Sequence, residues 1–180
     1  MLQENEDCNA IVADALDGDD LSNAFCRASG SNHADLLVAF LEKRINVDIK
    51  DRNDRTALMS ASFNGQEQSL RYLFDRNTTV DLQDRNGWTA LMWACRNGHA
   101  NLVTMLLEKN AYVDNQDKHG WTALMDASQR GHQAMVELLL RHGADKELQN
   151  QRGGTALTVA SNDSIRQLLQ DHVNTHFVLK

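Results

Sequence analysis

The chain has 180 residues, of which 42% are hydrophobic and 24% are charged, and its formal net charge is −7. This length and hydrophobic content can build a core and exclude a globally disordered chain, while the lack of proline excludes proline-rich and collagen-like proteins. No run of residues approaches the ~18 apolar residues of a membrane span, and the three cysteines form no Cys-x-x-Cys pair that would indicate a zinc or redox site.

Residues 1–17 belong to an acidic segment. The first 20 residues contain seven Asp and Glu side chains and no Lys or Arg, and the rest of the chain contains 18 residues of each charge. Nucleic acids and anionic membranes bind clustered positive charge, so we expect neither as a partner. We interpret the segment as a solvated end that aids solubility rather than as a docking tail, with a short helix around Cys8–Leu16 that packs on the next unit.

A 33-residue repeat organises the rest of the chain. Thr56, Thr89, Thr122 and Thr155 each begin the sequence Thr-Ala-Leu, and they are 33 residues apart. Further glycine, alanine and paired apolar residues keep the same step, which indicates a solenoid of stacked units. The units that we predict are a diverged N-terminal capping repeat at 18–50, full repeats at 51–83, 84–116 and 117–149, a shortened C-terminal capping repeat at 150–171 and a tail at 172–180.

Residues 84–116 illustrate how one unit is built. A turn leads into a first helix that a threonine hydroxyl caps and a left-handed glycine ends. A second helix follows with leucine and valine on one face, and neither helix can bury its apolar face without a neighbouring unit. The predicted bounds are Thr89 to about Asn97 for the first helix and about His99 to Lys109 for the second, with Gly98 and Asn110 as the terminating residues.

The pattern Asp-x-x-Gly-x-Thr-Ala-Leu-Met-x-Ala, followed by Gly-His, Leu-Leu-Leu and Gly-Ala-Asp, resembles the ankyrin repeat. It covers 51–149 as three full units, and 117–149 matches it best. The resemblance implies an all-α, ankyrin-repeat α-solenoid of helix–turn–helix units with β-hairpin-like loops, about five units long including its caps. It also gives His99 and His132 a structural role, in which each bridges backbone groups of adjacent repeats.

The chain departs from the family pattern at two positions in the motif. Alanine stands at 57, 90, 123 and 156, where the family has proline, and methionine stands at 59, 92 and 125, where the family has histidine. Because alanine is an excellent helix former, we expect the fold to survive with modestly lower stability. We expect these methionines and Cys95 to lie in the core.

The sequence contains no catalytic motif: no Gly-x-Ser-x-Gly, no phosphate loop, no His-Glu-x-x-His and no dinucleotide fingerprint. We therefore expect neither enzymatic activity nor a cofactor. His172 and His176 are four residues apart and could share a helical face as metal ligands, but no third ligand is evident, and we place them in a polar tail. The tail includes Phe177-Val178-Leu179, which either folds back on the last helix or marks the point where a longer parent was cut.

Equivalent residues of adjacent units lie side by side, ~8–10 Å apart, so the repeat makes the surface predictable. The resemblance implies that the residue before each capping threonine, the turn tips and the exposed side of each first helix form a concave face. All three tryptophans fall on that face, and Trp and Arg dominate binding hot spots; the alternative is that the tryptophans only shield their own helices. The candidate partner-binding residues are Trp88, Trp93, Trp121, Asp126, Arg55, Arg85, Arg96, Lys118 and Arg130.

We predict a non-enzymatic protein–protein interaction module, an adaptor or scaffold that binds a partner protein or an extended peptide through this Trp-rich face. Aliphatic or proline side chains of the partner would lie on Trp88 and Trp121. A basic group would meet Asp126, and acidic residues would meet Arg85 and Lys118. The alternatives are an inhibitor that occludes an enzyme or transcription factor, including a bacterial effector acting in a host cell, and the regulatory part of a larger enzyme. We expect a monomer in the cytoplasm, with the nucleus also compatible.

Overall fold

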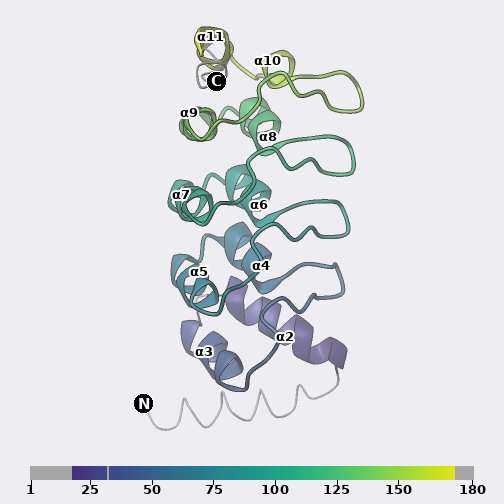
Figure 1. Cartoon of the computed structure of the whole chain (residues 1–180), viewed down its shortest axis with the longest axis vertical. Helices are drawn as coiled ribbons and strands as arrows, with labels where there is room; N and C mark the ends of the chain where they lie inside the picture. The colour runs from purple at the N-terminus through teal and green to yellow at the C-terminus, as the bar shows by residue number, and fades with distance from the viewer. Residues whose placement is uncertain (1–17, 32, 173–180) are drawn as a thin grey trace, which may run out of the picture.

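Two rows of short helices, with loops projecting to one side, form the part of the chain that the structure describes (Figure 1). The computed structural model describes residues 18–31 and 33–172. The first row contains α2 (Gly18–Gly30), α4 (Ala57–Asn64), α6 (Ala90–Arg96), α8 (Ala123–Arg130) and α10 (Ala156–Val159). The second row contains α3 (Ala34–Glu42), α5 (Glu67–Phe74), α7 (Ala100–Glu108), α9 (Gln133–Arg141) and α11 (Asp163–Asp171).

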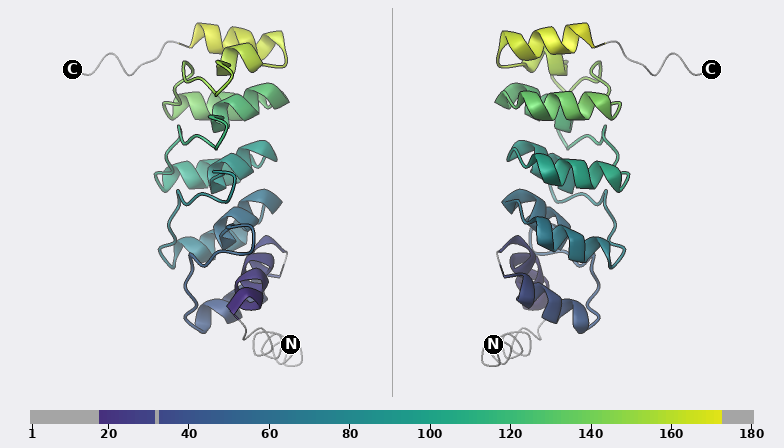
Figure 2. Two further views of the ribbon diagram at one scale, coloured as in Figure 1. Left: turned by 90° about the vertical axis from the view of Figure 1, so that its right-hand side faces the viewer. Right: turned by 90° about the vertical axis from the view of Figure 1, so that its left-hand side faces the viewer.

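Each helix packs against its neighbours in the same row, and the units stack along the long axis of the molecule (Figure 2). Among the described residues all regular elements are helices, so the predicted all-α solenoid is confirmed. No helix in this part of the chain is long and apolar enough to cross a membrane. The short helix predicted around 8–16 and the tail from 173 onwards lie outside the described residues.

The threonine of each repeat motif caps a first-row helix. The hydroxyl oxygens of Thr56, Thr89, Thr122 and Thr155 accept hydrogen bonds from the backbone amide three residues later, at 3.3, 3.3, 3.2 and 3.4 Å. This confirms the predicted caps, because each bond satisfies an amide that has no partner within the helix.

Helices α6 and α7 are each one residue shorter at both ends than predicted. The side-chain amide of Asn97, just beyond the end of α6 at Arg96, donates to the carbonyl oxygen of Trp93 at 2.9 Å. Gly98 takes the predicted left-handed conformation (φ 75°), and Asn110 does so after α7 (φ 59°).

A continuous apolar core lies between the rows. Ala61, Ala94 and Ala127 are fully buried, and their small side chains let adjacent first-row helices approach closely. The three methionines of the repeat motif and Cys95 are at most 3% exposed, which confirms that they belong to the core. The interior therefore depends on each unit being covered by the next.

Histidines join adjacent units through the backbone. The Nε2 atom of His99 lies 3.2 Å from the carbonyl oxygen of Phe63, and that of His132 lies 3.3 Å from the carbonyl oxygen of Arg96. Each contact ties the start of a second-row helix to the end of the preceding unit's first helix. The structural role implied by the resemblance is confirmed.

The projecting loops are held by a repeated side-chain acceptor. In each loop one Oδ1 atom accepts the backbone amides two and four residues later, at 2.7–3.0 Å, and it belongs in turn to Asp51, Asp84, Asp117 and Asn150. Backbone hydrogen bonds also join adjacent loop tips, for example from the Lys118 amide to the Asn86 carbonyl oxygen at 2.9 Å. Side chains on these loops are therefore presented from a fixed backbone.

We expect Asp117→Ala to lower the free energy of unfolding by about 1–3 kcal/mol, because two backbone amides lose a charged acceptor. Asp117→Asn keeps the Oδ1 acceptor, as Asn150 does at the equivalent position, and should cost less than about 1 kcal/mol. Urea denaturation followed by circular dichroism measures both. Equal losses for the two variants would contradict this account of the loop.

Candidate protein-binding surface

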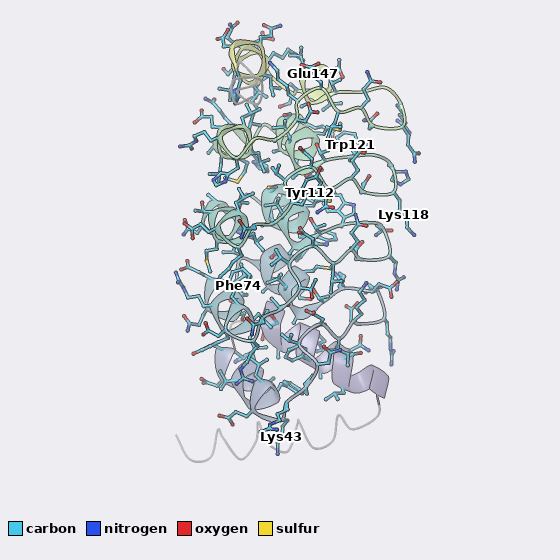
Figure 3. The ribbon with its side chains drawn as sticks, in the orientation of Figure 1. Lys43, Phe74, Tyr112, Lys118, Trp121 and Glu147 are labelled. Atoms are coloured by element: carbon cyan, nitrogen blue, oxygen red, sulfur yellow. The ribbon has the colours of Figure 1, made fainter. Side chains whose placement is uncertain are left out.

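The exposed sides of α4, α6 and α8, together with the loops that precede them, form one surface that we call the loop-side face. It contains every candidate residue of the sequence analysis, and Figure 3 locates Trp121 and Lys118 on the side of the molecule where the loops project. The capped helices and anchored loops described above fix the backbone of this face.

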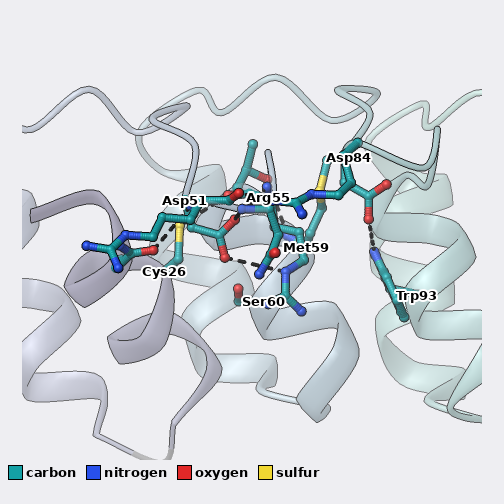
Figure 4. Close-up of polar contacts among 12 residues, drawn as sticks. Cys26, Asp51, Arg55, Met59, Ser60, Asp84 and Trp93 are labelled. Carbon is teal, nitrogen blue, oxygen red and sulfur yellow. Dashed lines mark hydrogen bonds and ion pairs between the residues drawn. The ribbon is translucent and has the colours of Figure 1, made fainter. Parts of the chain in front are cut away.

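An aromatic cluster of Phe63, Trp88 and Trp93 occupies the loop-side face. The rings of Phe63 and Trp93 meet edge to face with centroids 5.2 Å apart, and the rings of Trp93 and Trp88 are 4.7 Å apart and tilted by 41°. The indole Nε1 of Trp93 donates to Asp84 Oδ2 at 3.3 Å (Figure 4). Asp84, which anchors its own loop, thereby also orients the central ring of the cluster.

Exposure differs within the aromatic cluster. Phe63 is 39% exposed, whereas Trp88 and Trp93 are half-buried against the core. Part of the shielding role that we considered for the tryptophans is thus present. The cluster as a whole still offers an apolar surface, because its outermost ring has no protein atoms over much of its area.

An arginine pair continues the surface from the cluster. The guanidinium carbon of Arg96 lies 4.8 Å from the centroid of the Trp88 ring, and Arg96 Nη1 lies 3.6 Å from Asp126 Oδ1. Arg130 Nε donates to Asp126 Oδ2 at 2.9 Å. We call Arg96 and Arg130 the arginine pair.

This geometry corrects the role that we expected for Asp126. Its residue surface is only 5% exposed, and both of its carboxylate oxygens already face guanidinium groups. A basic group of a partner would find the carboxylate neutralised and covered.

The contacts of Phe63 with Trp93 and of Arg96 with Asp126 are equivalent, because both pairs are 30 residues apart and one pair follows the other by the 33-residue step. In each case the residue near the end of one first-row helix touches a residue one turn earlier on the next helix. The same contact between adjacent first-row helices is therefore an aromatic pair between α4 and α6 and an ion pair between α6 and α8.

The remaining candidate residues lie around this centre. Arg55 Nε is 3.4 Å from Asp51 Oδ2, and the Arg85 guanidinium donates to the backbone carbonyl of Arg52. Lys118 is exposed at a loop tip. Trp121 is half-buried against the core, and within the described residues its ring makes no aromatic contact, so the ring that stacks on Trp88 is that of Trp93 and not Trp121.

Phe63 was not among the candidate residues, although it occupies the same repeat position as Arg96. The shared repeat position was the signal that would have identified Phe63.

A pocket of about 280 Å³ lies beside Phe63, between α2 and α4, and its lining includes Arg27, Arg55 and Ser60.

The two described cysteines are buried and do not offer reactive thiols. Burial, and then the nearby Asp51 carboxylate, raises the pKa of Cys26 to about 12, and its Sγ donates to the carbonyl oxygen of Arg55 at 3.3 Å. Burial, and then Asp126, also raises the pKa of Cys95. Within residues 18–31 and 33–172 no group of three or more His, Cys, Asp or Glu side chains is arranged to hold a metal ion.

The raised thiol pKa values predict that stability falls as the pH rises above ~8.5, where the thiols of the unfolded chain ionise while those of the folded chain stay protonated. Between pH 8.5 and 10 the loss should approach about 2 kcal/mol per thiol. Urea midpoints measured across this range should therefore fall more steeply for the natural chain than for the Cys26→Ala/Cys95→Ala variant. Parallel pH dependences would contradict the prediction.

Family models for ankyrin repeats match residues 25–74, 76–150 and 113–177, which together cover most of the chain. No curated protein matches the chain significantly. With capped helix pairs stacked at a 33-residue step and family matches along most of its length, the chain belongs to the ankyrin repeat family.

Proposed function

We propose that the chain binds a partner protein or an extended peptide through the loop-side face, with the aromatic cluster at the centre of the interface, and that it acts as an adaptor or scaffold without enzymatic activity of its own. Ankyrin repeats are generally protein–protein interaction modules. The observation that carries the proposal is the outward ring of Phe63, 39% exposed, packed edge to face against the half-buried Trp93.

The aromatic cluster has the properties of a binding hot spot. Aromatic side chains bury a large area on association and have few rotatable bonds, so little conformational entropy is lost when a partner covers them. Here the rings are also held in advance, since Trp93 is hydrogen-bonded to Asp84 and Trp88 lies under the Arg96 guanidinium. A surface that is ordered before binding pays less of the ordering cost on association.

The loops beside the cluster support recognition of an extended segment. Their tips carry Arg85 and Lys118, both on exposed positions of successive units. A peptide that crosses the first-row helices would pass from the aromatic cluster to these cations, and acidic residues flanking its apolar part would suit them.

We expect Trp88→Ala/Trp121→Ala to remove most of the partner binding while leaving helicity intact. The measurement is a pull-down from cell lysate with the natural chain and the variant side by side, each checked by circular dichroism and thermal denaturation. Because both tryptophans also pack on the core, Phe63→Ala is the second variant: its ring is exposed, and its removal should weaken binding by about tenfold or more at little cost in stability.

Tyr112→Ala is the matched control, because Tyr112 is the other exposed large apolar side chain of the described residues and lies in the loop after α7. A band that is lost with the Trp88/Trp121 and Phe63 variants and kept with Tyr112→Ala supports the proposal. A partner that binds all of them equally contradicts it.

A further inference from the structure

Four carboxylates of the loop-side face serve as internal acceptors. Asp51, Asp84 and Asp117 each receive two backbone amides of their own loop, and Asp84 also receives the indole N–H of Trp93. Asp126 is 5% exposed and faces two guanidinium groups. The negative charge of these four carboxylates is therefore directed into the protein, whereas Asp54 of the first loop is exposed.

The arginine pair, in contrast, keeps donors on the outside. The side chains of Arg96 and Arg130 are 38% and 35% exposed. Each guanidinium has five N–H donors, and the two oxygens of a single carboxylate cannot occupy the donors of both groups. Arg96 is held between the Trp88 ring and Asp126, so its orientation is fixed before any ligand arrives.

A second cationic site lies on the other side of the aromatic cluster. Arg27 and Arg55 line the pocket beside Phe63, and the one acidic residue of that lining, Asp51, is used by its loop. The exposed ring of Phe63 thus lies between arginines of α2 and the first loop on one side and the arginine pair on the other.

We infer that the segment recognised by the loop-side face carries an Asp or Glu residue close to an apolar side chain, with the carboxylate bound by Arg96 and Arg130 and the apolar side chain on Phe63 and Trp93. This inference rests on the proposed function and identifies the partner as a peptide that has an acidic residue next to an apolar one. Carboxylates are the natural ligands of preoriented guanidinium groups, which bind them through paired, charge-assisted hydrogen bonds.

A basic group does not fit the same position. It would approach two guanidinium groups whose shared counter-ion is covered, and like charges brought together in an interface are penalised. A phosphodiester backbone is also disfavoured, because the pair shares one carboxylate and so carries a net charge of only about +1, whereas nucleic-acid binding requires many phosphate contacts.

The test is a selection of a random-sequence displayed peptide library on the full natural chain. The enriched peptides are then synthesised, and their affinities are measured by fluorescence anisotropy. We expect Asp or Glu next to an aromatic or aliphatic residue. Replacement of the acidic residue by alanine should weaken binding by about tenfold, and so should Arg130→Gln, which leaves Asp126 paired with Arg96. Arg141→Gln on α9 removes the same charge from the second row and should change binding less than about twofold.

The outcomes separate this inference from the proposed function. Peptides that depend on Phe63 but contain no acidic residue, or that contain Lys or Arg in its place, overturn the inference and leave the proposed function standing. Peptides that bind Phe63→Ala as tightly as the natural chain, or a selection without any binder, overturn both. A labelled single-stranded oligothymidylate that binds the natural chain and loses affinity with Arg130→Gln overturns the peptide assignment in favour of nucleic acid.

Discussion

Stacking of the first-row helices requires small side chains where they meet, and Ala61, Ala94 and Ala127 supply them at the 33-residue step. Once these helices are packed at one spacing, the loops that precede them are brought to the same spacing. Their tips can then form backbone hydrogen bonds with one another, and His99 and His132 can reach the carbonyl oxygen at the end of the previous unit's first helix. The regular arrangement of the loop-side face follows from that one close approach.

The elements of the fold could be predicted because their determinants are local and repeated. A capping threonine, a left-handed glycine and an apolar helix face act within one unit, and four copies of the pattern distinguish them from chance. The exact helix ends were harder to predict, since α6 and α7 each stop one residue short of the predicted bounds at both ends.

The candidate surface could be predicted only in outline. The repeat step identifies residues that occupy equivalent positions, but the contacts that define the surface join residues 30 apart, one helical turn away from equivalence. Columns of equivalent residues therefore indicated that tryptophans and arginines share a face, and did not indicate that Phe63 covers Trp93 or that Asp126 is paired. Counting acidic and basic residues had the same weakness, because the count does not show that the carboxylates of Asp51, Asp84, Asp117 and Asp126 are used as internal acceptors.

Because a single Oδ1 atom anchors each loop, the loop conformation does not depend on which side chain precedes the capping threonine. The acceptor and its two amide partners stay the same while the residue before the capping threonine is Arg55, Trp88, Trp121 or Gly154. A position that varies among guanidinium, indole and hydrogen without disturbing its frame is open to selection for new specificities at low risk to folding. The residue at this position can thus change in one unit of the array nearly independently of the other units.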